Sequence, residues 1–319
     1  MNYTNRQLPA PAITKTASTQ TFYTIRFLVD RERVQDAYRA YAYFRWVDDT
    51  LDAGDFRQND EACDFEDQER IAFLRRQKSL VETCSRGEVI PDATAEENML
   101  IELVRRDIGK SSGLQAYLRN MMKVMEFDAG RRGRLISQVE LSEYTRWLAM
   151  AVTEAMHYFI GHSCSSPHDE TRYLAVTGAH ITHMLRDTFD DFQAGYYNIP
   201  REVLETGHIQ PQDTESKAYR DWVRIRVWLA RECFKAGRDY LARVENPRCR
   251  LAGLAYTARF EWLLDTIERE GYYLRPAYSE RKSPGTGLRM GLSMLSSFFS
   301  LRRRDALTPP FIPQSLRKS

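Results

Sequence analysis

YAYFRWVDDTLD, residues 41–52, combines a helical pattern with an acidic face. The residues that would share one side of this helix step by four, three and four; they are Tyr41, Arg45, Asp48 and Asp52. Two carboxylates one turn apart repel each other and need a compensating cation. Mg²⁺ suits them, because it prefers carboxylate oxygens, keeps several waters and bridges to phosphate oxygens. The stretch therefore predicts a helix that carries a divalent metal site.

A second acidic stretch, HITHMLRDTFDD, covers residues 180–191. Its steps of three, four and four would again place four side chains on one helical face, namely His180, His183, Asp187 and Asp191. An arginine adjoins each acid pair, Arg45 in the first stretch and Arg186 in the second, as recognition of a diphosphate would require. The two histidines resemble a short zinc pair. No third ligand follows at an obvious spacing, so we interpret them as polar pocket residues.

A solvated helix face is the alternative explanation for each acid pair, since a single D-x-x-x-D on a surface helix is common. Both pairs lie in apolar and aromatic surroundings, however, where an uncompensated carboxylate is costly. The pattern also occurs twice, each time with an adjacent arginine. These features favour one site for metal and diphosphate that the two motifs share.

Composition narrows the functional classes. The 319 residues are 43% hydrophobic and 28% charged, which is typical of a globular protein with one or two domains. A net charge of +2 gives no reason to expect nucleic acid as a partner. The five cysteines show no C-x-x-C spacing, which suits a reducing cytoplasm. We find no signal peptide and no run of about 18 apolar residues, and we expect a cytoplasmic protein.

Helical spacing recurs along most of the chain, and no stretch alternates with period two for long enough to predict a sheet. We therefore predict an all-α fold in one domain. Residues 1–15 are expected to form an irregular leader, and the polar segment 54–69 is expected to be a loop. The predicted helices cover residues 18–54, 71–84, 95–107, 114–129, 140–163, 170–193, 216–244 and 249–274.

The two acidic stretches resemble the paired aspartate motifs of the squalene/phytoene synthase family, which includes bacterial dehydrosqualene synthases. Residues 19–22, TQTF, stand where that family has a Ser-x-Ser-Phe segment that contacts diphosphate. Residues 197–200, YNIP, match the segment after the second motif, and residues 271–274, GYYL, match the last core helix. The middle signature is matched by Phe127, Asp128, Arg134, Glu140, Leu141 and Tyr144. The resemblance runs from about residue 16 to 283.

This resemblance implies an isoprenoid synthase fold over residues 16–283, a single helical bundle around a central apolar cavity. The implied substrate is a prenyl diphosphate such as farnesyl or geranylgeranyl diphosphate. A trinuclear Mg²⁺ cluster would be held by Asp48, Asp52, Asp187 and Asp191, with Asp49 and Asp190 in support. Tyr41 and Arg45 join the first four aspartates as expected catalytic residues. The expected substrate-binding residues are Thr19, Thr21, Phe22, Arg45, Trp147, Met150, His180, His183, Arg186 and Tyr272.

Three departures from the family pattern bear on the substrate. His180 and His183 stand where the family usually has Gln and Asn. Gln20 replaces a basic residue that would contact diphosphate. In the helix that leaves room for prenyl chains, Met150 and a threonine replace glycines, and Trp147 lies one turn away. A cavity narrowed in this way would hold one prenyl chain rather than two.

Three functions therefore remain open. The first, which the family resemblance favours, is head-to-head condensation of two prenyl diphosphates to a squalene- or phytoene-like product. The second is ionisation and cyclisation, or hydrolysis, of a single prenyl diphosphate by a divergent terpene synthase. The third is a non-catalytic scaffold, which the four retained aspartates disfavour. Use of NADPH also stays open, because squalene-forming relatives use it without a G-x-G-x-x-G motif.

The C-terminal tail, residues 284–319, contains a segment with an apolar face and a basic end. In residues 288–304, four apolar side chains would fall on one helical face, and three arginines close the segment. This pattern predicts either peripheral contact with an anionic membrane or a helix that packs back on the domain.

Overall fold

The computed structural model describes residues 9–52, 62–107, 112–161, 164 and 166–278. Over these ranges every regular element is a helix and none is a strand, which confirms the all-α prediction. The chain divides into two compact units. Unit 1 comprises Met1–Ala129 and Glu154–His162, and unit 2 comprises Gly130–Thr153 and Ser163–Ser319.

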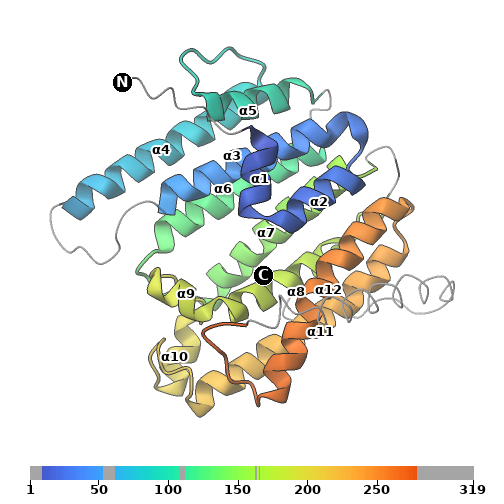
Figure 1. Ribbon diagram of the computed structural model, residues 1–319. Helices are drawn as coiled ribbons and strands as arrows, with labels where there is room; N and C mark the ends of the chain where they lie inside the picture. The colour runs from blue at the N-terminus through green and yellow to red at the C-terminus, as the bar shows by residue number, and fades with distance from the viewer. Residues whose placement is uncertain (1–8, 53–61, 108–111, 162–163, 165, 279–319) are drawn as a thin grey trace. The chain divides into compact units, whose positions relative to one another are not determined.

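Unit 1 contains the helices of the N-terminal part of the chain (Figure 1). They are α1 (Ala10–Ala17), α2 (Thr19–Leu28), the 3-10 helix η1 (Arg31–Arg33), α3 (Val34–Asp52), α4 (Ala62–Ser85), α5 (Ala95–Arg105) and most of α6 (Gly113–Arg131). The end of α7 (Gln138–Phe159) also belongs to it. α3 is the central element, because α1, α2 and α5 all pack against it.

A buried polar network ties α3 to α4 and α5. Tyr43, which is fully buried, donates its hydroxyl to Gln77 over 2.9 Å, and Gln77 donates in turn to Glu97 over 2.9 Å. Arg76 closes the network with two bonds to the Glu97 carboxylate. Glu97 and Thr94 also form a capping box at the start of α5. These bonds satisfy a buried carboxylate and thereby hold the helix that carries the first acidic motif.

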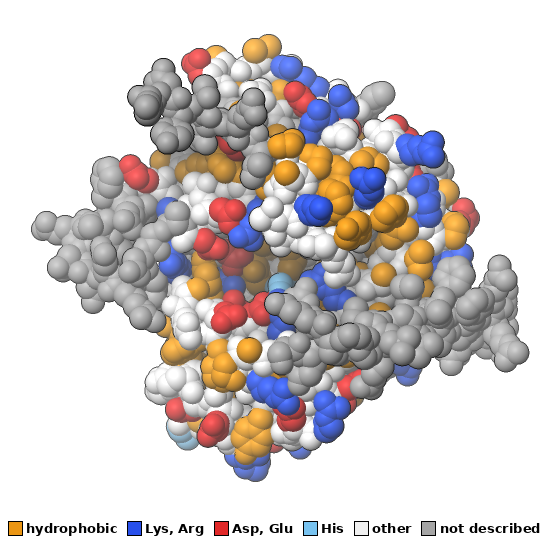
Figure 2. All heavy atoms as spheres, viewed as in Figure 1, with side chains coloured by type: hydrophobic (Ala, Val, Ile, Leu, Met, Phe, Trp, Pro, Cys, Tyr) orange, Lys and Arg blue, Asp and Glu red, His pale blue; other side chains and the backbone are white. Residues whose placement is uncertain are grey.

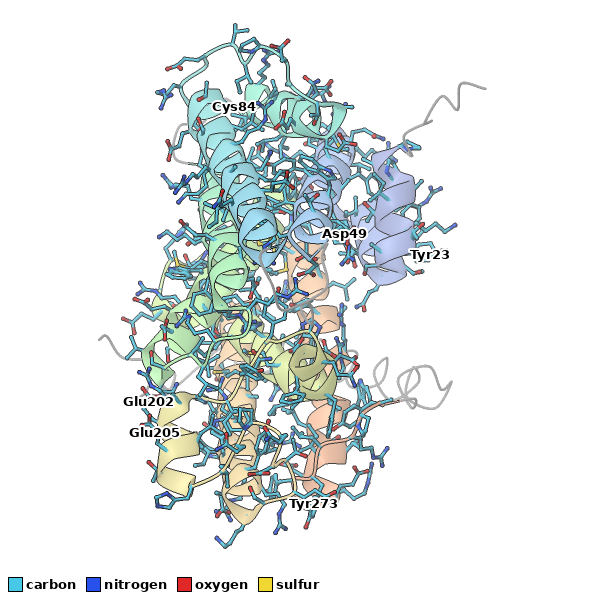
Figure 3. The ribbon with its side chains drawn as sticks, turned by 90° about the vertical axis from the view of Figure 1, so that its left-hand side faces the viewer. Tyr23, Asp49, Cys84, Glu202, Glu205 and Tyr273 are labelled. Carbon is cyan, nitrogen blue, oxygen red and sulfur yellow. The ribbon has the colours of Figure 1, made fainter. Side chains whose placement is uncertain are left out.

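The outer side of α2 is aromatic. Tyr23 and Phe27 are exposed, and their rings stack with centroids 5.9 Å apart. Figure 3 shows Tyr23 projecting outward from α2. Figure 2 shows hydrophobic side chains gathered over α1 and α2, with basic side chains among them.

Unit 2 contains the helices that follow the first unit in the sequence. Besides the first part of α7, they are η2 (Glu170–Tyr173), α8 (Leu174–Arg186), α9 (Thr188–Gln193), α10 (Arg201–Gly207), α11 (Lys217–Ala242) and α12 (Pro247–Arg269). α8 packs against both α11 and α12. Two glycines allow the close approach of α8 and α11: a Cβ on Gly178 would lie 2.9 Å from the carbonyl oxygen of Ala230, and one on Gly237 would lie 2.6 Å from the backbone nitrogen of Ala175.

The helix boundaries correct several predictions at the N-terminal end. Residues 10–17 of the expected irregular leader form α1, where Pro11 lies in the first turn and favours a helix start. The helix expected over 18–54 breaks after α2. Asp30 leaves helical pairing there, because its N–H donates to the carbonyl of Phe159 and its carboxylate accepts from the N–H of Gly161. α4 begins at Ala62, so the second half of the expected loop 54–69 is helical.

Other differences lie in unit 2. The helix expected over 170–193 is divided into η2, α8 and α9, and α10 was not predicted. The tail segment 288–304 lies outside the described residues. No helix within the described ranges is long and apolar enough to cross a membrane.

Candidate functional site

The first acidic motif lies at the C-terminal end of α3, in unit 1. Asp48, Asp49 and Asp52 occupy its last turns, and the final turn carries no basic residue. Arg45 donates to Asp48 over 3.3 Å and also pairs with Asp49, which Figure 3 labels near the end of α3. Because the C-terminus of a helix carries partial negative charge, three carboxylates placed there add to an already electronegative end. One exposed arginine compensates only part of this charge.

The surroundings of Asp48 disfavour the ionised form of its carboxyl group. Burial, and then the neighbouring charge of Asp52, raise the pKa of Asp48 to about 6, although Arg45 opposes the shift. Asp128, on α6, raises it further. A carboxylate whose ionisation is disfavoured by its anionic neighbours gains strongly from a bound cation. The sequence did not place Asp128 beside the motif, since its only signal was the match to the family's middle signature.

The second acidic motif lies where α8 ends and α9 begins, in unit 2. Asp187 sits at the junction with φ −94° and ψ 8°. The continuous helical stripe predicted from His180 to Asp191 is therefore wrong. Thr188 adjoins this break, and its buried hydroxyl donates to the carbonyl of Met184 over 2.9 Å, a type of contact that often bends helices.

Asp187 is held by two neighbours. Arg186 donates to both of its oxygens, over 2.5 and 2.6 Å, and His183 Nε2 lies 2.9 Å from Oδ2. Burial alone would raise the pKa of Asp187, but the bonds from His183 and Arg186 outweigh it and hold that pKa well below its ordinary value. Asp187 is thus an ionised carboxylate, with a histidine and an arginine directly beside it.

Asp191 is fixed by residues that sequence reasoning missed. The side-chain amide of Asn198 donates to Asp191 Oδ2 over 2.6 Å, and Asn198 Oδ1 accepts from Arg131 over 2.9 Å. Arg131 is 5% exposed and lies 4.9 Å from the ring centroids of both Tyr144 and Tyr196. Asp190, in contrast, is exposed. The segment YNIP was the only signal for Asn198, and nothing in the pattern marked Arg131.

The remaining predicted residues of unit 1 lie on α2 and α3. Ser18 caps α2, accepting from the N–H of Thr21 over 3.2 Å and sharing a 2.9 Å bond with its hydroxyl. Thr19 is exposed and its hydroxyl reaches the carbonyl of Lys15 at 3.4 Å. The ring of Phe22 packs between neighbouring aromatic side chains, and Tyr41 is partly buried.

The remaining predicted residues of unit 2 differ in burial. Trp147 and Met150 are partly buried on α7, and Tyr272 is partly buried with a left-handed φ of 66° just after α12. His180 is only 5% exposed, and its ring meets that of Tyr144 edge-on with centroids 5.1 Å apart. The role of these residues in binding substrate stays a prediction.

The donor chemistry fits Mg²⁺. Both motifs supply carboxylates and no thiolates, which suits a hard cation. Within the described parts of the chain, no three His, Cys, Asp or Glu side chains are grouped closely enough to hold a metal alone. Mg²⁺ is usually bound by one or two carboxylates together with waters and substrate phosphates.

Comparisons with known proteins agree with the all-helical fold. A squalene synthase, HpnC, from Alicyclobacillus acidocaldarius has a TM-score of 0.61 at 18% identity, over 83% of this chain and 94% of that one. A dehydrosqualene synthase solved with a ligand has a TM-score of 0.65 at 15% identity, over 92% and 95%. No curated protein matches. The family model for squalene/phytoene synthase matches residues 15–283, and the chain therefore belongs to the squalene/phytoene synthase family.

Proposed function

We propose that this protein is a Mg²⁺-dependent prenyltransferase that ionises an allylic prenyl diphosphate and joins it head to head with a second one, releasing diphosphate. The observation that carries the proposal is the anionic cluster at the end of α3. There burial, followed by the charges of Asp52, Asp128 and Asp49, raises the pKa of Asp48 to about 6. Membership of the family supports the same chemistry.

The proposed roles divide between the two motifs. Asp48 and Asp52 in the first motif, and Asp187 and Asp191 in the second, would each act as metal ligands, with Asp49 and Asp190 supporting them. The metal supplies positive charge where negative charge develops on the departing diphosphate. Arg45 and Arg186 are placed beside these carboxylates and would donate to diphosphate oxygens.

Ionisation breaks the C1–O bond of the allylic diphosphate, and the electron pair leaves with the diphosphate. The double bond of the second chain then supplies the pair for the new carbon–carbon bond, and a carbon-bound proton is lost. The product of this step still carries the second diphosphate, so a second C–O cleavage must release it with its electron pair. The resulting cation ends as a hydrocarbon by losing a proton or, if NADPH takes part, by accepting its hydride. Apolar and aromatic walls would exclude water from the cation, and ring faces such as those of Tyr41 and Phe22 would stabilise it.

A second candidate is a terpene synthase that uses a single prenyl diphosphate. It is favoured by the side chains of α7 and α8 that replace smaller or more polar family residues. Met150 is partly buried, Thr153 is 1% exposed and His180 is 5% exposed, so these three side chains occupy interior volume. If they narrow the cavity, one chain would fit where two normally do.

The test is incubation of the purified full-length protein with Mg²⁺ and C10, C15 or C20 allylic diphosphates, with and without NADPH, followed by mass spectrometry of the products. A C30 or C40 hydrocarbon supports head-to-head condensation, and its reduction only with NADPH would assign that cofactor. A C10, C15 or C20 hydrocarbon or alcohol would replace this proposal with the single-substrate reaction. Absence of diphosphate release in every condition would leave the non-catalytic scaffold.

A further inference from the structure

The outer face of α11, in unit 2, carries two large hydrophobic side chains that are exposed to solvent. Trp228 is 53% exposed, and Ile225, three residues before it, is 58% exposed. Residues three apart are neighbours on the surface of a helix, so the two side chains form one apolar patch. Tryptophan is highly buried on average, and it is enriched at protein interfaces. Neither residue belongs to the acidic motifs, so the proposed reaction does not explain the patch.

Charged side chains extend from Trp228 along the helix in both directions. An α-helix turns by about 100° per residue, and charged residues whose side chains fall within about 40° of Trp228 lie at four, seven and eleven residues before and after it. Each of them is exposed or partly exposed. This charged stripe consists of Lys217, Asp221, Arg224, Glu232, Lys235 and Asp239.

The order of the charges in the stripe reverses its sign at Trp228. Before Trp228 the order is positive, negative, positive, and after it the order is negative, positive, negative. Positions at equal distances on the two sides of Trp228 therefore carry opposite charges. The three pairs are Arg224 with Glu232, Asp221 with Lys235, and Lys217 with Asp239.

Ion pairs within the helix are an alternative explanation for a stripe of mixed charge. Two such pairs exist in its first half, since Asp221 lies 2.6 Å from Lys217 and 3.2 Å from Arg224. Pairing within one helix does not require an exposed tryptophan between the two halves of the stripe. It also does not require the signs to reverse there. Both features are expected if a second copy of the same helix packs on this face.

We propose that α11 forms the contact surface of a homodimer, in which the α11 helices of two copies pack antiparallel across a two-fold axis at Trp228. A two-fold contact is isologous, so residue i of one copy meets residue j of the other while j meets i. Positions at equal distances from Trp228 then face each other, and each of the three oppositely charged pairs forms twice. The two indole rings supply an apolar centre and the charges a polar rim, as in other protein interfaces.

The test is the oligomeric state of the purified full-length protein, measured by sedimentation equilibrium between about 1 and 200 μM. The wild type should pass from monomer to dimer in this range, because one pair of helices is a small contact beside the roughly 1,600 Å² of a standard interface. Trp228→Ala should weaken the dimer about tenfold or more. Phe27→Ala is the matched control, because Phe27 is also an exposed aromatic residue, at 67%, but lies on α2. It should leave the dimer unchanged.

Two charge reversals separate the contact from any effect on folding. Arg224→Glu brings acidic side chains face to face across the two-fold axis, and Glu232→Arg brings arginines face to face, so each variant alone should dimerise more weakly than the wild type. Mixed in equal amounts, the two variants should form a heterodimer, because every facing pair is again opposite in charge. Mixing would not repair a variant that had failed to fold.

Three results would overturn the proposal. The first is a wild type that stays monomeric over the whole range, as it would if another segment of the chain covered this face. The second is a dimer that Trp228→Ala leaves as strong as before, and the third is a mixture of the charge-reversed variants that dimerises no better than each alone. The contact uses no metal or diphosphate, so it can fail separately from the proposed prenyl transfer.

Discussion

The side-chain amide of Asn198 donates to Asp191 Oδ2 over 2.6 Å, and Asn198 Oδ1 in turn accepts from the buried side chain of Arg131. Groups that orient a metal-binding carboxylate affect metal affinity nearly as much as the ligands do. We therefore predict that Asn198 is a positioning residue for the second acidic motif. Substitution of Asn198 therefore tests whether Asp191 binds metal.

We predict that Asn198→Ala raises the Mg²⁺ concentration needed for half-maximal activity by about 10- to 100-fold. Saturating Mg²⁺ should restore most of the activity, because the substitution removes an orienting bond rather than a ligand. Asn98→Ala is the matched control, since Asn98 is exposed on α5 and bonds only to nearby backbone carbonyls. Activity that falls equally at all Mg²⁺ concentrations would contradict the positioning role.

Removal of the carboxylates themselves should have a larger effect. Asp48→Ala and Asp187→Ala should each abolish measurable diphosphate release and leave the circular dichroism spectrum helical. The reason is that the charge of the departing diphosphate loses its stabilisation. Asp221→Asn is the control, because Asp221 belongs to an exposed cluster on α11. Unchanged turnover in either alanine variant would exclude the metal assignment.

The raised pKa of Asp48 predicts a dependence of stability on pH. The folded value of about 6 lies above the ordinary 3.8, so the native state binds the proton more tightly than the unfolded state. In EDTA, this group should therefore lower the free energy of unfolding as pH rises from about 4 to about 6. Its side chain is 41% exposed, so screening limits the loss to about 1 kcal/mol.

The contribution of Asp48 to this pH dependence can be measured by urea denaturation of the wild type and of Asp48→Asn at pH 4.5 and pH 7. The wild type should lose more stability between the two pH values than the variant does. Added Mg²⁺ should reduce the difference, because a bound cation favours the ionised carboxylate. Equal pH dependence in the two proteins would show that Asp48 does not feel the anionic neighbours.

The local patterns along the chain predicted the all-α fold, because helical periodicity depends on residues within a few turns of each other. They could not predict the break after α2, since Asp30 is drawn out of helical pairing by Phe159 and Gly161, far away in sequence. The break at Asp187 adjoins Thr188, whose hydroxyl donates to the carbonyl of Met184, but the sequence does not show at which threonine such a bond interrupts a helix. Arg226 on α11 shows the same limit, because it is buried, whereas an arginine on a helix is normally exposed.

Substitution of Met150 tests the narrowed cavity. Met150→Gly should shift products toward longer chains, and the cost to helix stability should be about 1 kcal/mol. Met150→Leu keeps the volume nearly constant and should leave the product profile unchanged. The measurement is mass spectrometry of products from mixed C10, C15 and C20 substrates. An identical profile in Met150→Gly and the wild type would argue that this side chain does not limit chain length.

The close approach of α8 and α11 can be tested with two glycines that differ in their surroundings. A Cβ at position 237 would lie 2.6 Å from the backbone of Ala175, whereas one at position 130 would meet no atom within 4 Å. Gly237→Ala should therefore lower the free energy of unfolding by about 1 to 3 kcal/mol, because a helix backbone must move to relieve the clash. Gly130→Ala, in α6, should raise it by about 0.5 to 1 kcal/mol by reducing the freedom of the unfolded chain. Urea denaturation of both variants decides the matter, since equal effects would mean that α8 and α11 do not meet at Gly237.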